Sequence, residues 1–183
     1  LTRDGEYEKA REILFQAQKA PDLSLEKKQQ LYVNYGAVLW KLGNKEGAIR
    51  NLEAAHEKYP CGIIYQTLGY LYVENGDKEK ALSYNEEALD YDHEDPIVLD
   101  NMGQTYYRLF NDKQKALTYF KKANELRAIQ IDTLYFLAKY DIENGDHQAA
   151  LEKIDKALGG NFSPLNYATE EMLNQLKAQI KGE

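Results

Sequence analysis

The 183-residue sequence contains one cysteine, four prolines and three histidines. With Cys61 as its only cysteine, the chain cannot form an intrachain disulfide, which is compatible with a reducing compartment. A nucleophilic cysteine would also need a base and an orienting group, and no motif in the sequence supplies that pair. His56, His93 and His147 are widely separated, and none has the i,i+4 partner of a helical zinc site. These scarcities predict that the chain has no metal site and is not an enzyme.

Long apolar segments are also missing from the sequence. No run of apolar residues approaches the roughly 18 that a membrane-spanning helix needs, and no signal-like segment opens the chain. We therefore predict a cytoplasmic protein with no direct membrane insertion in this segment. Residue 1 is leucine rather than methionine, so we expect the chain to begin inside a longer protein, and an upstream signal or membrane anchor stays open.

The balance of charge argues against nucleic acid as a partner. Thirty acidic and 23 basic residues give a net charge of -7, whereas a protein that neutralises phosphates usually carries the opposite sign. The acid-rich stretch at residues 90–96 lacks the glycine and glutamate positions of a calcium loop, which favours a solvated turn. Gly159-Gly160 is an isolated pair rather than a phosphate-binding loop. No cofactor is predicted.

Repetition is the strongest feature that the sequence does have. Three tracks of small residues recur at intervals of 33 to 35 residues: Gly36, Gly69, Gly103 and Ala138; Ala48, Ala81, Ala116 and Ala150; and Ala55, Ala88, Ala123 and Ala157. Small residues are needed where two helix backbones approach closely, because a larger side chain would force them apart. The tracks therefore predict pairs of packed helices, repeated along the chain.

Between the two helices of each pair lies a recurring turn dipeptide. The four copies are Gly43-Asn44, Gly76-Asp77, Asn111-Asp112 and Gly145-Asp146. The first residue is suited to end a helix in the left-handed conformation, and the second is suited to cap the helix that follows. This pattern predicts a helix-turn-helix in each repeat.

This pattern resembles the tetratricopeptide repeat family, whose unit is a helix-turn-helix of about 34 residues. The best copy carries the family's large and small residues at Tyr65, Leu68-Gly69, Tyr72, Ala81 and Ala88. Three departures stand out, namely Asn85 in place of an aromatic residue, Asp141 in place of tyrosine, and one extra residue near Phe110. The resemblance implies an all-α fold, a right-handed superhelical solenoid of helix-turn-helix repeats with a C-terminal capping helix.

The domain organisation follows from placing the repeats along the chain. We predict a single solenoid over residues 1–183, with a second helix of a truncated repeat at 1–22 and full repeats at 29–61, 62–95, 96–130 and 131–163. Ser163-Pro164 resembles a helix start, with serine as the cap and proline in the first turn, and predicts a capping helix over 164–181.

The resemblance also implies a function, which is the binding of a protein or peptide ligand in a concave groove lined by the first helices. By position, the predicted groove residues are Asn34, Trp40, Tyr70, Asn101, Gln104, Tyr107, Arg108, Tyr135 and Lys139. In the family, an asparagine amide at the position of Asn34 and Asn101 often holds the ligand backbone, since an amide both donates and accepts hydrogen bonds. The chain is then a non-catalytic scaffold for protein-protein interaction.

Alternatives to a peptide groove remain open at this point. The chain is also consistent with a structural or self-assembly module of a larger protein, with or without a membrane anchor, in which it forms a homo-oligomer. The groove tyrosines could instead pack on neighbouring helices within the core. An enzyme is kept only because a catalytic domain could lie upstream of Leu1.

Overall fold

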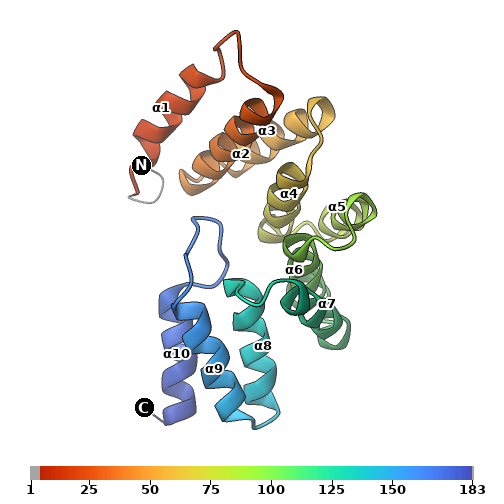
Figure 1. Cartoon of the computed structure of the whole chain (residues 1–183), viewed down its shortest axis with the longest axis vertical. Helices are drawn as coiled ribbons and strands as arrows, with labels where there is room; N and C mark the ends of the chain where they lie inside the picture. The colour runs from red at the N-terminus through yellow and green to blue at the C-terminus, as the bar shows by residue number, and fades with distance from the viewer. Residues whose placement is uncertain (1–4, 183) are drawn as a thin grey trace. The chain divides into compact units, whose positions relative to one another are not determined.

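The computed structural model describes residues 5–182, and in that range every regular element is a helix (Figure 1). The elements in chain order are α1 (Tyr7–Ala17), α2 (Leu25–Lys41), α3 (Lys45–Lys58), α4 (Gly62–Asn75), α5 (Lys78–Tyr91), α6 (Pro96–Gln104), η1 (Thr105–Phe110), α7 (Lys113–Leu126), α8 (Ile131–Glu143), α9 (His147–Leu158) and α10 (Glu170–Lys181). The all-α fold class that the resemblance implies is confirmed. Residues 1–22 were predicted to hold the second helix of a truncated repeat. The helix α1 covers Tyr7–Ala17 of this segment, and residues 1–4 lie outside the described range.

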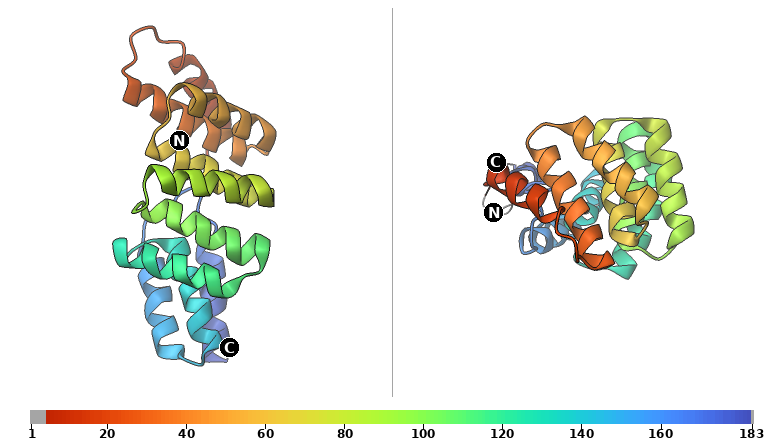
Figure 2. Two further views of the ribbon diagram at one scale, coloured as in Figure 1. Left: turned by 90° about the vertical axis from the view of Figure 1, so that its right-hand side faces the viewer. Right: turned by 90° about the horizontal axis from the view of Figure 1, so that it is seen from above.

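The helices belong to two compact units. Unit 1 runs to His93 and unit 2 begins at Glu94. In unit 1, α2 packs on α3, α3 on α4 and α4 on α5, while α1 packs on α2. In unit 2, α6 packs on α7, α7 on α8 and α8 on α9, and α10 lies against both α9 and α8 (Figures 1 and 2). The single continuous solenoid expected over the whole chain stays a prediction.

The turn inside each repeat has the predicted conformation. Gly43, Gly76 and Gly145 have φ angles of 82°, 79° and 78°, and Asn111 has a φ of 55°, all in the left-handed region that ends a helix. The residue after each of them caps the next helix, since its side chain accepts a hydrogen bond from a backbone N–H three residues on; the caps are Asn44, Asp77, Asp112 and Asp146. These local signals set where the paired helices end and begin.

The small-residue tracks mark the closest contacts between helices. All eight alanines of the two alanine tracks are fully buried. On the glycine track, a Cβ added to Gly36 would lie 3.0 Å from Leu52 Cγ, and one added to Gly103 would lie 2.5 Å from the Phe120 ring. The second helix of a repeat therefore places a large side chain directly on the small residue of the first helix.

The extra residue of the third repeat is accommodated by a π-helix. Residues 105–110 form η1, which continues α6 with wider turns. The backbone N–H groups of Asn111 and Asp112 both donate to the Tyr106 carbonyl. A π-helical turn holds one more residue than an α-helical turn, so the insertion is absorbed before the repeat's turn is reached.

The start of the C-terminal helix differs from the prediction. The sequence pattern places the start of the capping helix at Pro164, but α10 begins at Glu170, after the Thr169 side chain accepts a hydrogen bond from Met172 N–H. The Ser163 hydroxyl instead accepts from Leu165 N–H within a short turn. The Ser-Pro pair thus opens a turn, because the residues that follow are held by a contact with α8. As predicted, the helix itself covers the last repeat.

Candidate functional site

The structure distributes the nine predicted groove residues between the two units. In unit 1, Asn34 is exposed on α2, Trp40 is half-buried on the same helix, and Tyr70 is buried on α4 with 8% of its surface exposed. The Asn34 side-chain oxygen accepts a hydrogen bond from Gln30 Nε2 at 3.0 Å. The Lys45 ammonium lies 5.1 Å from the Trp40 ring. The three predicted residues of this unit thus differ widely in depth, and Asn34 and Trp40 each contact a neighbour on or next to their own helix.

Unit 2 holds the other six predicted residues. Asn101 and Gln104 on α6 and Tyr135 on α8 are buried, while Tyr107 and Arg108 on η1 and Lys139 on α8 are partly exposed. The contacts described below connect five of them, namely Gln104, Tyr107, Arg108, Tyr135 and Lys139, and we call the surface around these five residues the unit 2 face. The resemblance gave the orientation of these positions along the helices but not how deeply each side chain would be buried.

Aromatic rings and cations alternate on the unit 2 face. The Tyr107 ring lies 4.9 Å from Phe136 and 5.8 Å from Tyr140, measured between ring centroids. The Lys139 ammonium is 5.1 Å from the Tyr107 ring and 5.7 Å from the Tyr135 ring. Ammonium groups at this range are attracted to the ring faces. This surface therefore carries the positive charge of Lys139 next to the Tyr107 and Tyr135 rings.

Beneath this surface, a chain of hydrogen bonds connects η1 to α8. Arg108 Nη1 donates to Gln104 Oε1 at 2.9 Å, and Gln104 Nε2 donates to Asp100 Oδ2 at 2.7 Å. The other carboxylate oxygen of Asp100 accepts from Thr133 Oγ1 at 2.6 Å. Gln104 has no exposed surface, and Asp100 and Thr133 are buried. The network holds the guanidinium group of Arg108 and joins the first helices of two successive repeats.

Asp100 has an unusual environment for a carboxyl group. Burial, together with the nearby Asp132 carboxylate, raises the pKa of Asp100 to about 7, while the hydrogen bonds from Thr133 and Gln104 act in the opposite direction. Desolvation penalises the charged form, which is why burial dominates here. The Asp100 carboxyl group thus connects Gln104 on α6 with Thr133 on α8.

One contact on the unit 2 face comes from a segment that the sequence pattern predicts to be partly helical. Residues 159–169 join α9 to α10, and we call this segment the Tyr167 loop. The Asp132 carboxylate accepts hydrogen bonds from the backbone N–H groups of Tyr167, at 3.0 Å, and Ala168, at 2.9 Å. The sequence pattern does not predict this pairing. The only signal for it is an acidic residue in the first turn of α8, which is common for other reasons.

The Tyr167 ring completes this contact. It lies 5.4 Å from the Phe136 ring and nearly parallel to it, and 5.9 Å from the Tyr135 ring. The Arg108 guanidinium carbon is 3.9 Å from the centroid of the Tyr167 ring, within the range of a strong cation–π contact. Two predicted groove residues, Arg108 and Tyr135, therefore contact a side chain of the same protein.

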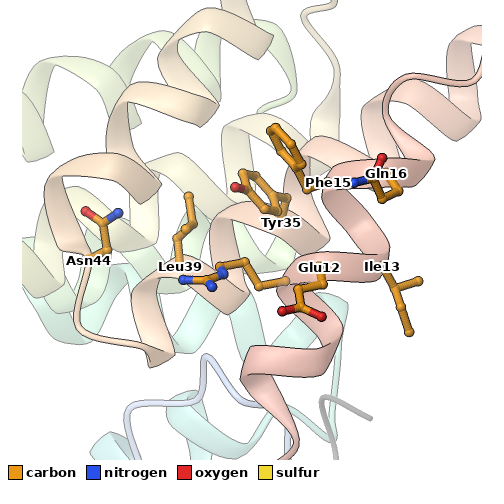
Figure 3. Close-up of a pocket in the computed structure, with 8 residues that line it drawn as sticks. Glu12, Ile13, Phe15, Gln16, Tyr35, Leu39 and Asn44 are labelled. Carbon is orange, nitrogen blue, oxygen red and sulfur yellow. The ribbon is translucent and has the colours of Figure 1, made fainter.

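A second open surface lies in unit 1, between α1 and α2. It is a cleft of about 840 Å³, and Figure 3 shows the side chains that line it. The lining residues are Arg11, Glu12, Ile13, Phe15, Gln16, Tyr35, Leu39 and Asn44. The Phe15 and Tyr35 rings lie 6.3 Å apart, yet Phe15 is 46% exposed and Ile13 is 51% exposed. The helix α1 thus leaves apolar side chains in contact with solvent.

Metal-binding and membrane-spanning features are absent from the described part of the chain. Among residues 5–182 there is no group of three or more histidine, cysteine or acidic side chains arranged to hold a metal ion. Over the same range, no helix combines the length and the apolar character needed to cross a membrane. Cys61 is a free, partly exposed thiol before α4.

Fold and repeat geometry together define a helix-turn-helix repeat protein, and comparison with known sequences identifies the repeat. The tetratricopeptide repeat profile matches residues 29–57 and 63–95. In these two segments the chain therefore carries tetratricopeptide repeats, as the small-residue tracks and turn dipeptides indicated. Proteins of this type generally mediate protein-protein interactions.

Two curated relatives have similar sequences. The Protein CTR9 homolog of Arabidopsis thaliana is 29% identical over 185 residues, which is 97% of this chain but only 17% of the length of that protein. The Photosystem I assembly protein Ycf3 of Prochlorococcus marinus is 28% identical over 147 residues, covering 74% of this chain and 83% of that protein.

Solved structures support the fold. A thermophilic tetratricopeptide-repeat protein of Thermus thermophilus has a TM-score of 0.74 at 20% identity, covering 98% of this chain and 92% of the other. PilW, a type IV pilus biogenesis factor, has a TM-score of 0.64 at 22% identity, covering 94% of this chain and 76% of its own. Likeness at this level of identity concerns the fold alone.

Proposed function

We propose that the chain is a non-catalytic scaffold that binds a peptide or protein segment, and that the unit 2 face contacts this ligand. The observation that supports it is the group of partly exposed side chains on adjacent first helices, Tyr107, Arg108 and Lys139. Aromatic and arginine side chains are the residue types that most often dominate binding energy at protein interfaces. The predicted residues that are buried, such as Gln104, then support the surface rather than touch the ligand.

Charge indicates the chemistry of the ligand. Two cations stand on this face although the chain as a whole carries a net charge of -7. A carboxylate on the ligand would approach Arg108 and Lys139 favourably, and an aromatic ring would pack on Tyr107. A nucleic acid would be repelled by the net charge of the rest of the chain. A cytoplasmic location forms part of the same proposal.

A charge reversal tests the proposal with little risk to the fold. Lys139→Glu changes a partly exposed residue of the unit 2 face, and Lys122→Glu makes the same change at an exposed position on α7 as the matched control. Affinity capture from the source organism, followed by mass spectrometry, identifies proteins retained by the parent. We expect the same proteins to bind the Lys139→Glu variant at least ten-fold more weakly and the control unchanged.

A second variant tests the aromatic part of the face. Tyr107→Ala combined with Arg108→Ala is expected to abolish capture of those proteins. If the ring is mainly a core residue, the same pair lowers the melting temperature sharply, since loss of a buried aromatic costs about 3–5 kcal/mol. If the Lys139→Glu variant and the double variant both fold and still bind these proteins as the parent does, the unit 2 face is not the binding site.

The alternative function, a self-assembly module, has one observation in its favour. The cleft between α1 and α2 exposes Phe15 and Ile13, and exposed apolar patches often mark interfaces. A helix from a second copy of the chain is the occupant that this alternative requires. Sedimentation velocity over a concentration series is expected to show reversible dimers that Phe15→Asp removes. A monomer at every concentration would reject this alternative.

A further inference from the structure

The Tyr167 loop contacts the unit 2 face in the manner of a bound peptide. Its contacts combine one aromatic side chain, Tyr167, and two successive backbone N–H groups. Recognition of a protein segment commonly uses this combination, in which main-chain hydrogen bonds hold the segment and a pocket for one side chain gives specificity. The loop is joined to the fold at both ends, by α9 and α10.

The groups that receive the loop are preorganised independently of it. Arg108 is held from below by Gln104, whose side chain is fully buried. Phe136 is stacked on Phe120 at 4.8 Å, inside the packing between first and second helices. Both partners are therefore held by contacts within the repeats, in addition to their contacts with the loop. The receiving surface is therefore a property of the repeats and not of the loop.

Apart from Ala168, no residue of the loop is fully buried, and Phe162, Pro164 and Leu165 are half-buried. Asn161, Ser163 and Thr169 are exposed, and the hydrogen bonds of Ser163 with Leu165 and Asn166 stay within the loop. Ala168 is buried beside its hydrogen bond to Asp132. Segments with few buried apolar contacts open locally without unfolding of the whole protein.

We infer that the Tyr167 loop is an internal ligand of the unit 2 face, which an external partner displaces by presenting an aromatic residue whose own backbone N–H, together with that of the next residue, is free to donate. This inference rests on the proposed function, because it names the chemistry of the ligand for the same face. The loop competes at the high effective concentration of a tethered ligand, on the order of millimolar for a short connection. Binding of the partner is weakened by that competition, and any change that releases the loop strengthens it.

A peptide copied from the loop tests the inference without knowledge of the natural partner. The probe is a fluorescein-labelled peptide with the sequence of residues 161–169, titrated by fluorescence anisotropy. In the Tyr167→Ala variant the internal ring is gone, so we expect the probe to bind at least ten-fold more tightly than to the parent. Phe162→Ala, which removes a ring from the same loop but not from the Tyr167 cluster, is the matched control and should behave as the parent.

Specificity of the probe is checked by the same substitution in the peptide. A peptide with alanine in place of its tyrosine should lose at least ten-fold in affinity for the Tyr167→Ala protein. Equal binding of the probe to parent and variant would overturn the inference. The inference would also be overturned if the Tyr167→Ala protein bound no peptide at millimolar concentration although its circular dichroism showed the same helix content as the parent.

Hydrogen exchange on the unaltered protein keeps the inference testable if the variant does not fold. The amide protons of Tyr167 and Ala168 should exchange at least ten-fold faster than buried amides of α8, and saturating probe should accelerate them further. Exchange as slow as in α8 and insensitive to the probe would overturn the inference. If Lys139→Glu abolishes partner capture but these tests fail, the proposed function stands and only the internal ligand is wrong.

Discussion

Asn85 provides the sharpest test of the packing described for these repeats. It is fully buried on α5, at the position where the other repeats place Leu52, Phe120 and Ile154. Its Nδ2 group donates to the carbonyl oxygens of Ala81, at 2.8 Å, and Gly69, at 3.3 Å. Its Oδ1 atom is buried, and no partner for it exists among the described residues. We predict that Asn85→Leu stabilises the protein.

The magnitude follows from two gains and one loss, and the loss is that of the two hydrogen bonds from Nδ2, worth about 0.5–1.5 kcal/mol each. A buried polar atom without a partner costs about 1–3 kcal/mol, and this cost disappears with the amide. A buried leucine contributes about 1.5–3 kcal/mol from the removal of apolar surface from water, part of which is lost if the new side chain must repack. Leu52 already packs on Gly36 in the preceding repeat, so the same geometry is available against Gly69. The expected net gain in the free energy of unfolding is about 1–3 kcal/mol.

Urea denaturation followed by circular dichroism measures this gain, and the reciprocal variant supplies the control. Leu52→Asn replaces a fully buried leucine at the equivalent position by an amide. The loss of apolar burial and the burial of a polar group should lower the free energy of unfolding by about 3–5 kcal/mol. A lower denaturation midpoint for Asn85→Leu, with an unchanged slope, would refute the reasoning. It would mean that the amide is required at this helix contact.

Three further predictions concern packing, turns and pH. Ala81→Leu adds three carbons at a fully buried helix contact and should destabilise by about 1–3 kcal/mol through overpacking, which a lower urea midpoint would report. Gly76→Ala, at a φ of 79°, should cost about 1–2 kcal/mol, and Gly62→Ala, where a Cβ meets nothing within 4 Å, should leave thermal stability nearly unchanged. Because burial and Asp132 raise the pKa of Asp100 to about 7 in the folded state, the folded state binds this proton more tightly than the unfolded state does. The free energy of unfolding should therefore fall between about pH 4, the ordinary pKa of an aspartate, and about pH 7. In Asp100→Asn this slope should be smaller, and an equal slope in both proteins would exclude Asp100 as its source.

The sequence predicted those parts of the fold that depend on local signals. Turn residues such as Gly76 and caps such as Asp77 act within a few positions of themselves, so their types identify the turn directly. Ala81 and its counterparts were identifiable because every repeat needs a small residue where its two helices approach closely. The extra residue near Phe110 was also visible in the spacing. That it would be absorbed as a π-helix was not, because an insertion can equally be placed in a loop.

Contacts between distant residues account for what the sequence did not predict. Ser163-Pro164 is a sound local signal for a helix start, but Asp132 binds the N–H groups of Tyr167 and Ala168 and keeps that stretch out of the helix. For the candidate site, the resemblance assigned Tyr135 to the first-helix face, and the structure buries it beneath Tyr167. Side-chain depth depends on what covers a position, and the cover here is a loop that the pattern of repeats does not describe.

The wide turn of η1 also changes how the length of a repeat should be understood. Gly103 keeps its contact with Phe120, and Asn111 keeps its left-handed turn, although one more residue lies in this repeat than in its neighbours. The close contact at Gly103 and the left-handed turn at Asn111 are thus both retained, although the number of residues between them differs from that in the other repeats. A residue added or removed between these two contacts changes the angular position of Tyr107 and Arg108 around the helix axis. Because Tyr107 contacts Phe136 and Arg108 contacts Tyr167, such an insertion also changes which side chains this repeat presents to the repeat that follows.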